Sequence, residues 1–359
     1  MGSLLPALAL FCCCCIASGG NVVDTTVWHL ASELTVENVG WHESTNPYVR
    51  FPAHGHDQVP SGVWFLSRHS AGVSVHFLSD APEIRVRWSL INAELAMPHM
   101  PATGVSGVDL YVRAENGRWV FAGNGRPQKQ NDNVATFNYG MKAGETHEYQ
   151  LYLPLYNGVT SVEIGVDPSA KLQPAKQHAE PIVYYGTSIA QGGCASRPGM
   201  AFTNILSREL DRPIINLGFS GSAMLEPDVA TLIAELDPKL FVIDALWNAG
   251  SLPPAELAKR LEGFARTLRA KHPKTPILFV GQSLVHPIAE PSGTSKTQIE
   301  VVERLQKEGM LGLSILDGAK LYSDDTEGTV DGVHPNDLGM MAHAKALLPT
   351  LKRLVGKRP

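Results

Sequence analysis

The chain has 359 residues, with 30 Lys and Arg, 35 Asp and Glu, and a formal net charge of -5. Its 44% hydrophobic and 18% charged residues are typical of a folded globular protein and exclude a disordered chain. The mild acidity gives no reason to expect a nucleic-acid partner, and the length predicts two domains.

The N-terminus carries an apolar segment, Leu4 to Ala17, followed by the small residues Ser18 and Gly19. The segment is too short to span a bilayer comfortably, and it predicts a secretory signal peptide over residues 1–20. We therefore expect a secreted or periplasmic protein without a stable membrane span.

Four of the five cysteines, Cys12 to Cys15, lie in this segment, where a lipid anchor is the alternative to cleavage. Removal of the segment leaves Cys194 alone, which excludes an intramolecular disulfide and a cysteine-based zinc site. We interpret Cys194 as a buried, inert thiol.

Residues 21–167 have the pattern of an all-β domain. Short alternating runs, punctuated by Gly, Pro and Asn, predict a β-sandwich or jelly roll. The expected strands cover 72–78, 83–88, 108–113, 119–122, 148–153 and 161–166. Residues 168–180 contain internal prolines and little periodicity, which predicts an interdomain linker.

The period changes in residues 181–359. Apolar runs at 182–185, 213–217, 240–244, 277–280 and 312–316 alternate with helical patterns at 200–210, 257–268 and 337–354. Strands buried on both faces and alternating with helices predict an α/β doubly wound parallel sheet. Ligands of such sheets bind beyond the carboxyl ends of the strands, so the loops there are the candidate site.

Four of these loops carry candidate catalytic groups, and the first three follow successive strands. Ser188 lies between glycines after the first strand, where its hydroxyl can project from the strand end. The loop after the second strand contains glycines and two rival serines, Ser220 and Ser222. Asn248, after the third strand, can donate a hydrogen bond to a developing oxyanion without bringing a charge of its own.

The last loop contains Asp331 and His334. A carboxylate three residues before a histidine can fold back onto Nδ1 and leave Nε2 free to accept a proton from a serine. Glu327, Asp324 and Asp325 are competing candidates for that orienting role. A metal bound by Asp331 and His334 lacks further ligands at suitable spacing, and no cofactor is expected.

Taken together, these loops resemble the SGNH (GDSL-type) hydrolases, named for a catalytic Ser, an oxyanion Gly and Asn, and a His. The matching blocks are Gly186-Thr-Ser188, Asn216-Leu-Gly-Phe-Ser-Gly221, Asn248 and Asp331-Gly-Val-His334. Two residues depart from the usual pattern, because Thr187 and Ala249 stand where the family usually has Asp. Both departures resemble a branch whose N-terminal β domain carries Gly-x-Asp-Leu-Tyr, present here as Gly107-Val-Asp-Leu-Tyr111.

This resemblance implies an SGNH-type (flavodoxin-like) catalytic domain with an acyl-enzyme mechanism. Ser188 would be the nucleophile, His334 the base and Asp331 its orienting carboxylate, with Ser188, Gly221 and Asn248 at the oxyanion. We expect short-chain, acetyl-type esters on an acylated small molecule or polysaccharide, because no apolar lid-like insertion interrupts the loops.

Three alternatives stay open. An α/β-hydrolase would also show Ser, Asp and His in this order, although it usually separates Asp and His more widely. A lipase or acylhydrolase of longer chains is the second. A glycan-binding protein with a catalytically silent hydrolase-like domain is the third, and the sequence leaves the oligomeric state open.

Overall fold

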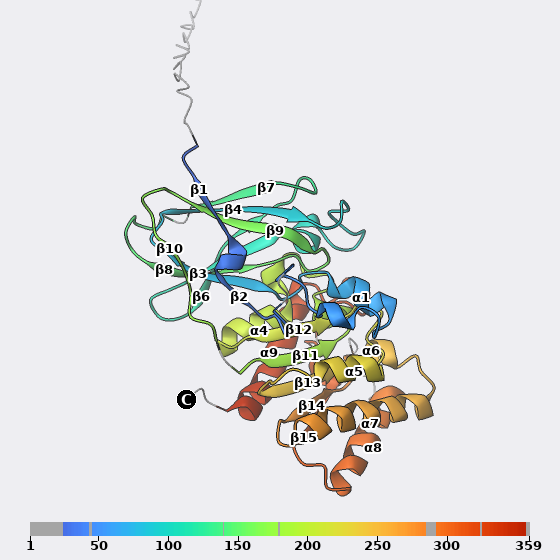
Figure 1. Ribbon diagram of the computed structural model, residues 1–359. Helices are drawn as coiled ribbons and strands as arrows, with labels where there is room; N and C mark the ends of the chain where they lie inside the picture. Colours follow the sequence, from blue (N-terminus) through green and yellow to red (C-terminus); the bar gives the residue numbers. More distant parts are fainter. Residues whose placement is uncertain are drawn as a thin grey trace, which may run out of the picture.

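The computed structural model describes residues 24–42, 45–138, 140–178, 180–284, 292–323 and 325–356. The predicted signal peptide, residues 1–20, and Cys12 to Cys15 lie outside these ranges. Figure 1 shows an antiparallel β half stacked on a mixed α/β half. Within the described ranges, every helix is too short or too polar to cross a membrane.

The N-terminal half consists of two antiparallel sheets. One has four strands in the order β1-β9-β4-β7, and the other has the order β10-β3-β8-β5-β6, with β2 paired to β3. The strands are β1 (Val27–Leu30), β2 (Thr35–Glu37), β3 (Ser74–Ser79), β4 (Glu83–Leu90), β5 (Val108–Arg113), β6 (Trp119–Gly125), β7 (Asn133–Asn138), β8 (His147–Tyr152), β9 (Val159–Val166) and β10 (Leu172–Pro174). Two short helices, α1 (Ser61–Ser67) and α2 (Ala102–Val105), interrupt them.

Alternating side chains fill the space between the two sheets. In β4, Ile84, Val86 and Trp88 are buried, whereas the residues between them are only partly buried. Phe77 and Tyr149 stack in the same core with their ring centroids 5.2 Å apart. The predicted β-sandwich is therefore confirmed.

The C-terminal half has a parallel sheet of five strands in the order β12-β11-β13-β14-β15. Its strands are β11 (Ile182–Gly186), β12 (Ile214–Gly218), β13 (Leu240–Asp244), β14 (Ile277–Val280) and β15 (Leu313–Leu316). Its helices are α3 (Ser188–Gln191), α4 (Phe202–Leu210), α5 (Pro227–Ile233), α6 (Leu246–Ala249), α7 (Pro254–Lys271), α8 (Gly293–Lys307) and α9 (Asp337–Val355).

Helices cover both faces of this sheet. Val183 and Tyr185 of β11 belong to a core shared with α5, α7 and α8, whereas Ile182 and Tyr184 belong to one shared with α4 and α9. All five residues of β11 are buried, as a strand covered on both faces requires. The predicted doubly wound α/β fold is confirmed.

Helix α7 illustrates how the sequence sets these elements. Pro254 occupies its first turn and Glu256 adds a negative charge there, both favourable at a helix N-terminus. Its buried residues are Leu257, Leu261, Phe264, Ala265 and Leu268. Their spacing places them on one stripe, which packs against the sheet.

Several short elements differ from the sequence expectation. Strand β10 lies inside the range expected to be a linker and pairs with β3. Strands β1, β2 and β7 and helix α8 were not among the expected elements.

The Gly-x-Asp-Leu-Tyr motif joins the two halves. The fully buried carboxylate of Asp109 accepts hydrogen bonds from Arg197 and from the backbone N–H of Gly199, each at 2.7 Å. The same guanidinium donates to the Tyr111 hydroxyl at 2.8 Å. A Cβ on Gly199 would collide with the Tyr111 hydroxyl, so the two halves meet here at a distance that only glycine permits.

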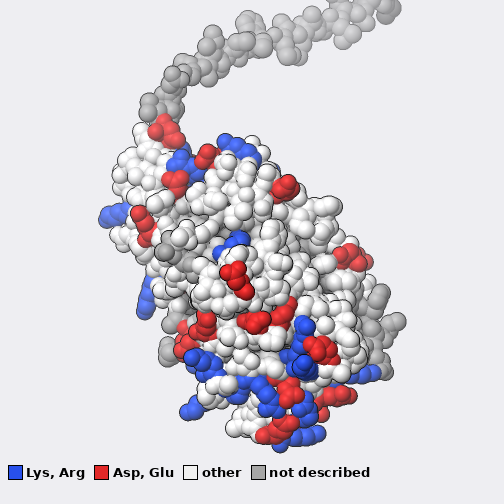
Figure 2. All heavy atoms as spheres, turned by 45° about the vertical axis from the view of Figure 1, so that its right-hand side comes forward, with Lys and Arg blue, Asp and Glu red and all other residues white. Residues whose placement is uncertain are grey.

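Charges are intermixed on the face of the molecule shown in Figure 2. Between α7 and α8, Arg266 and Arg304 donate to the same Glu262 carboxylate at 2.7 and 2.8 Å. Exposed pairs of this kind are screened by solvent and add little to stability. This face therefore presents no single-sign field to a partner.

Candidate active site

Ser188 lies at the carboxyl end of β11, as the first residue of α3. Thr187 caps this helix, because its Oγ1 accepts the N–H of Ile189 at 3.4 Å. A Cβ on Gly186 would lie 2.6 Å from Cβ of Ala190, so glycine is needed for the chain to turn this tightly. Ser188 is 8% exposed. Its backbone N–H, at the start of a helix, has no intrahelical acceptor.

Ser188 and His334 come into hydrogen-bond contact, although 146 residues separate them. Oγ of Ser188 lies 2.8 Å from Nε2 of His334, and Nδ1 of His334 lies 2.7 Å from Oδ2 of Asp331. The order serine, imidazole, carboxylate is the arrangement in which the imidazole accepts the serine proton.

The backbone of its own loop fixes the Asp331 carboxylate. Oδ1 accepts the N–H groups of Val333 and His334 at 3.0 and 2.8 Å. Burial acts to raise the pKa of Asp331, but these bonds and the contact with the His334 ring lower it to about 2. The carboxylate is therefore ionised at any pH at which the protein would work.

Of the competing carboxylates, those of Asp325 and Glu327 belong to described residues, and neither is hydrogen-bonded to His334. Asp325 accepts hydrogen bonds from the Ser323 hydroxyl and from the N–H of Glu327, and so caps its own loop. Asp324 lies outside the described residues. Of the described carboxylates in this loop, Asp331 is the one in contact with His334.

A hydrogen bond joins the loop after β12 to the helix α6. The carbonyl of Phe219 accepts the N–H groups of Ser222 and Ala223 and the Nδ2 of Asn248, the last at 3.2 Å. Gly221 has a φ of +66°, and its N–H has no hydrogen-bond partner among the described residues. An amide has two N–H groups, so Asn248 keeps one for a ligand.

The N-terminal half supports this loop through Arg50, a residue that the sequence did not single out. Arg50 is 1% exposed, and its guanidinium carbon lies 4.9 Å from the ring centre of Phe219. It donates to four carbonyl oxygens, those of Leu66, His69, Asn216 and Gly218. Burial lowers the pKa of Arg50 to about 9, which leaves it charged at neutral pH.

Tyr156 also reaches the nucleophile from the N-terminal half. Its hydroxyl donates to the carbonyl of Ser188 at 3.2 Å. The same carbonyl accepts the N–H groups of Gly192 and Gly193 at 3.1 and 2.8 Å. A Cβ on Gly193 would lie 2.9 Å from the Tyr156 hydroxyl, so this glycine lets the two halves close around Ser188.

Two further titratable groups lie near the strand ends. Asp244, the last residue of β13, accepts a hydrogen bond from the Tyr184 hydroxyl at 2.8 Å, and burial raises its pKa to about 7. The thiol of Cys194 is buried and unpaired, as expected, and burial raises its pKa to about 11. A thiol in that state is a poor nucleophile.

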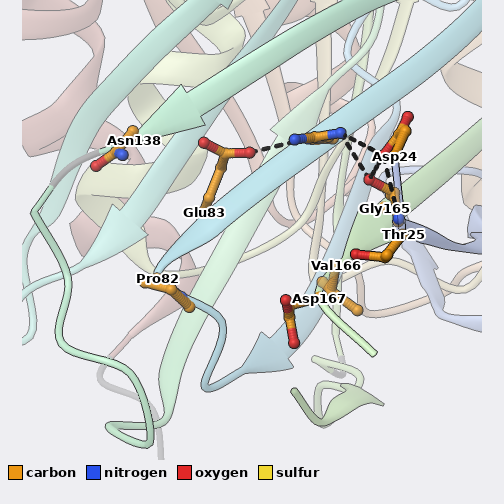
Figure 3. A pocket seen from close by; sticks show the side chains of 10 residues that line it. Asp24, Thr25, Pro82, Glu83, Asn138, Gly165, Val166 and Asp167 are labelled. Carbon is orange, nitrogen blue, oxygen red and sulfur yellow. Dashed lines mark hydrogen bonds and ion pairs between the residues drawn. The ribbon is translucent and has the colours of Figure 1, made fainter. Parts of the chain in front are cut away.

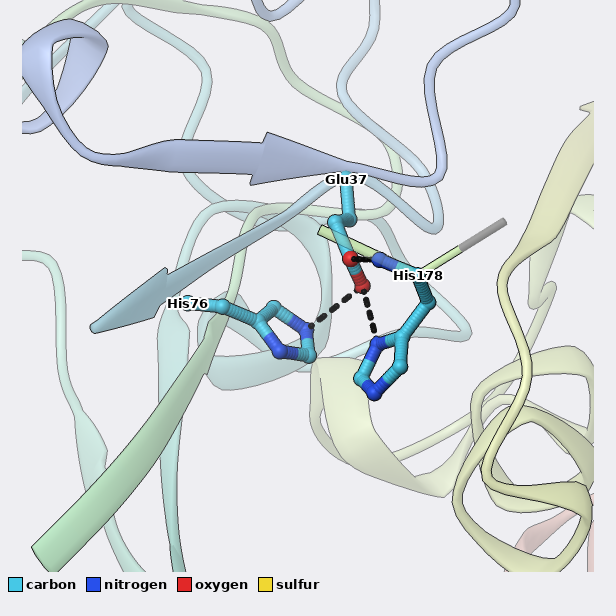
Figure 4. A group of neighbouring side chains, drawn as sticks. All are labelled: Glu37, His76 and His178. Carbon is cyan, nitrogen blue, oxygen red and sulfur yellow. Dashed lines mark hydrogen bonds and ion pairs between the residues drawn. The ribbon is translucent and has the colours of Figure 1, made fainter. Parts of the chain in front are cut away.

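Figure 4 shows three neighbouring residues of types that can bind a metal ion: Glu37 at the end of β2, His76 in β3 and His178 in the expected linker. Oε2 of Glu37 lies 3.1 Å from Nδ1 of His178 and 3.4 Å from Nε2 of His76. Zinc-bound histidines usually donate their other ring N–H to a partner, and Nδ1 of His76 has none among the described residues. Burial lowers the pKa of His76 to about 4. We interpret the group as a hydrogen-bonded junction that ties His178 to β2.

A polar pocket of about 520 Å³ lies on the N-terminal half (Figure 3). Arg85 lies in its lining and pairs with Glu83 and Asp24, each at 2.8 Å. The charges of Arg85, Glu83 and Asp24 therefore compensate one another, and the Asp167 carboxylate accepts hydrogen bonds from Ser169. The pocket is separate from the Ser188 site.

A parallel sheet with a serine–imidazole–carboxylate series at its strand ends is an architecture of the serine hydrolase class. A model of the GDSL-like lipase/acylhydrolase family matches residues 179–352, and a model of the N-terminus of SGNH-hydrolase-type esterases matches residues 26–172. The chain belongs to the SGNH (GDSL-type) hydrolase family. A comparison with curated protein sequences gives no match.

Solved structures share this two-part architecture. One described as a GDSL-like lipase from Bacteroides ovatus is 33% identical, with 92% of this chain and 98% of that chain covered and a TM-score of 0.83. A salicylyl-acyltransferase from a tetracycline biosynthetic pathway has 20% identity, the same coverage and a TM-score of 0.75. A family two carbohydrate esterase from Clostridium thermocellum, in complex with cellohexaose, has 16% identity, covers 80% of this chain and 94% of its own, and has a TM-score of 0.56.

Proposed function

We propose that this protein is a secreted serine esterase that removes short acyl groups, acetyl above all, from carbohydrate. The observation that carries the proposal is the continuous contact from Ser188 through His334 to Asp331, at 2.8 and 2.7 Å. The carbohydrate part draws support from the fold shared with a carbohydrate esterase.

The reaction has two halves. Oγ of Ser188 attacks the ester carbonyl while Nε2 of His334 accepts its proton, and the carbonyl oxygen becomes an oxyanion. As the intermediate collapses, the C–O bond to the alcohol breaks and His334 returns the proton to the departing oxygen. Water, deprotonated by His334, then attacks the acyl-serine and releases the acid and the free serine.

Three donors would hold the oxyanion: the N–H of Ser188, the N–H of Gly221 and the Nδ2 of Asn248. The first two are backbone groups without a hydrogen-bond acceptor in the part of the chain that the structure describes, and the third keeps one N–H beyond its bond to Phe219. One such donor typically contributes about 3 kcal/mol to the transition state. Asp331 holds the imidazole in the tautomer that leaves Nε2 free and stabilises the imidazolium.

The test is hydrolysis of p-nitrophenyl acetate, butyrate and octanoate by the purified protein and by Ser188→Ala. We expect activity that falls with chain length and a loss of roughly 10⁴–10⁶-fold in the variant. Ser222→Ala, which removes a rival hydroxyl, is the matched control and should keep its activity.

Other outcomes would overturn parts of the proposal. Full activity in Ser188→Ala would contradict the assigned nucleophile. A preference for octanoate would favour a lipase of longer chains. Folded protein without any esterase activity, together with affinity for glycans, would favour the silent binding protein.

A further inference from the structure

A loop of the N-terminal half lies beside the catalytic histidine. The ring of His99 lies 6.2 Å from the ring of His334, measured between centroids, with the two planes inclined by 44°. His99 belongs to the segment between β4 and α2, and its side chain is exposed. Neither of its ring nitrogens has a hydrogen-bond partner among the described residues. The exposed imidazole of His99 can therefore form hydrogen bonds with a ligand bound next to His334.

The position of His99 is fixed by a tight turn. Met97 and Met100 exchange two backbone hydrogen bonds, of 2.9 and 3.1 Å, and leave Pro98 and His99 at the tip. Pro98 restricts the backbone of the turn further. Met100 is 2% exposed and packs into the core of the C-terminal half. The turn is thus anchored on the half that carries His334.

Helix α2 adds a second anchor. The Thr103 hydroxyl donates to the carbonyl of Ser196 at 2.6 Å. The N–H of Ser196 in turn donates to Asp337 at 2.9 Å, three residues beyond His334. A Cβ on Gly104 would collide with the carbonyl of Ala195, so the helix packs directly on the backbone. These contacts of the turn and of helix α2 therefore fix the position of His99 relative to His334.

The chemistry of acyl transfer identifies which part of a substrate lies beside His99 and His334. His334 returns its proton to the departing alcohol oxygen, so the alcohol portion must lie against His334 when the ester bond breaks. A side chain next to His334 therefore faces the alcohol rather than the acyl group. Imidazole both donates and accepts hydrogen bonds, which suits an alcohol that carries further hydroxyl groups.

We propose that His99, presented by the turn from Met97 to Met100, is a specificity-determining residue that hydrogen-bonds hydroxyl groups of the alcohol portion of the ester, a sugar. The inference rests on the proposed function, because it assumes that Ser188 and His334 perform acyl transfer. It adds that the N-terminal half forms part of the substrate site.

The test compares two substrates with the same acyl group. p-Nitrophenyl acetate has an alcohol portion without further hydroxyls, whereas methyl glucosides monoacetylated at different positions have several. His99→Ala should raise KM for at least one glucoside acetate by roughly 3–10-fold, the loss of one hydrogen bond. Its kcat on that substrate and its kcat/KM on p-nitrophenyl acetate should change less than about twofold. His99→Gln, which can still hydrogen-bond, should restore part of the loss.

His29→Ala is the matched control, since His29 lies on β1 in the sandwich. An equal loss on both substrates in His99→Ala would overturn the inference, because His99 would then act on His334 rather than on the sugar. Unchanged KM for every glucoside acetate would overturn it as well. Wild-type protein that hydrolyses neither acetate would instead contradict the proposed function itself.

Discussion

At the scale of single residues, the two carboxylate oxygens of Asp331 make different contacts, and a substitution can separate their roles. Oδ1 holds the loop through two backbone N–H groups, and Oδ2 faces Nδ1 of His334. Asp331→Asn keeps an acceptor for the backbone but presents an N–H to Nδ1, which forces the wrong tautomer. We expect kcat to fall by about 10⁴-fold with little change in thermal stability.

The measurement is kcat on p-nitrophenyl acetate together with the melting temperature. Asp325→Asn serves as control, because Asp325 caps its own loop away from His334. Near-normal activity of Asp331→Asn would mean that another group orients the imidazole.

Asp244 predicts a pH dependence of stability. Its pKa is about 7 in the folded protein, through burial, against 3.8 in an unfolded chain. Between these values the folded state binds the proton more tightly, so stability falls as pH rises. From pH 5.5 to pH 8 the loss from this group is on the order of 2 kcal/mol.

Urea unfolding at both pH values, for wild type and Asp244→Asn, measures this contribution. The amide carries no charge and still accepts from Tyr184, so the variant should lose less stability than wild type as the pH rises. An identical pH dependence in the two proteins would show that Asp244 does not titrate in this range.

At the scale of elements, the loop after β12 depends on a side chain from the other half. Arg50 joins the carbonyls of Asn216 and Gly218 to those of α1 and its following turn. Lysine has one ammonium group and cannot reach four carbonyls in a planar fork. Arg50→Lys should lower the free energy of unfolding by about 2–4 kcal/mol, because buried carbonyls lose their donors.

Because Gly221 lies in the same loop, we expect kcat of Arg50→Lys to fall by about 10–100-fold, with KM nearly unchanged. That separation of kcat from KM identifies a positioning residue. Arg118→Lys, at an exposed arginine, is the control. A variant that is less stable but has wild-type kcat would assign Arg50 a structural role alone.

The sequence predicts contacts between residues that are close along the chain better than contacts between distant residues. Asp331 and His334 share one loop, so their contact follows from spacing, and Ser188 and Asn248 follow from the rule that strand ends meet at one edge. No sequence pattern pointed to Arg50, Tyr156 or His99. These residues belong to the N-terminal half, and a local pattern does not show which residues of the other half they will contact. The group formed by Glu37, His76 and His178 was missed for the same reason.

The strands show a similar division. Several of the longer strands, such as β4 and β11, were predicted within two residues of their bounds. The six-residue β7 was missed, because polar Asn133 is buried and apolar Val134 is exposed, which hides the alternation. Strands β2 and β10 have three residues each, too few to show a period of two. Both are edge additions to a sheet that longer strands define, so the fold class was predictable without them.

At the scale of the whole molecule, the two halves share their interior. Phe51 and Val63 of the N-terminal half belong to the same buried cluster as Phe219, and Met100 and Leu155 belong to the cluster beneath β11. An interface of buried apolar residues resembles a core more than a mobile domain contact. We therefore expect one cooperative unfolding transition rather than two.

Asp109 provides the sharpest test of this coupling. Asp109→Ala removes the acceptor of Arg197 and of the Gly199 N–H, and leaves a partly buried charge unpaired at the junction. Breaking a buried pair in this way costs about 3–5 kcal/mol. Calorimetry should show a single transition at lower temperature, with activity lost in the same range, because neither half keeps its core alone. Two separate transitions in wild type would contradict the shared core. Separation only in the variant would show instead that this ion pair holds the halves together.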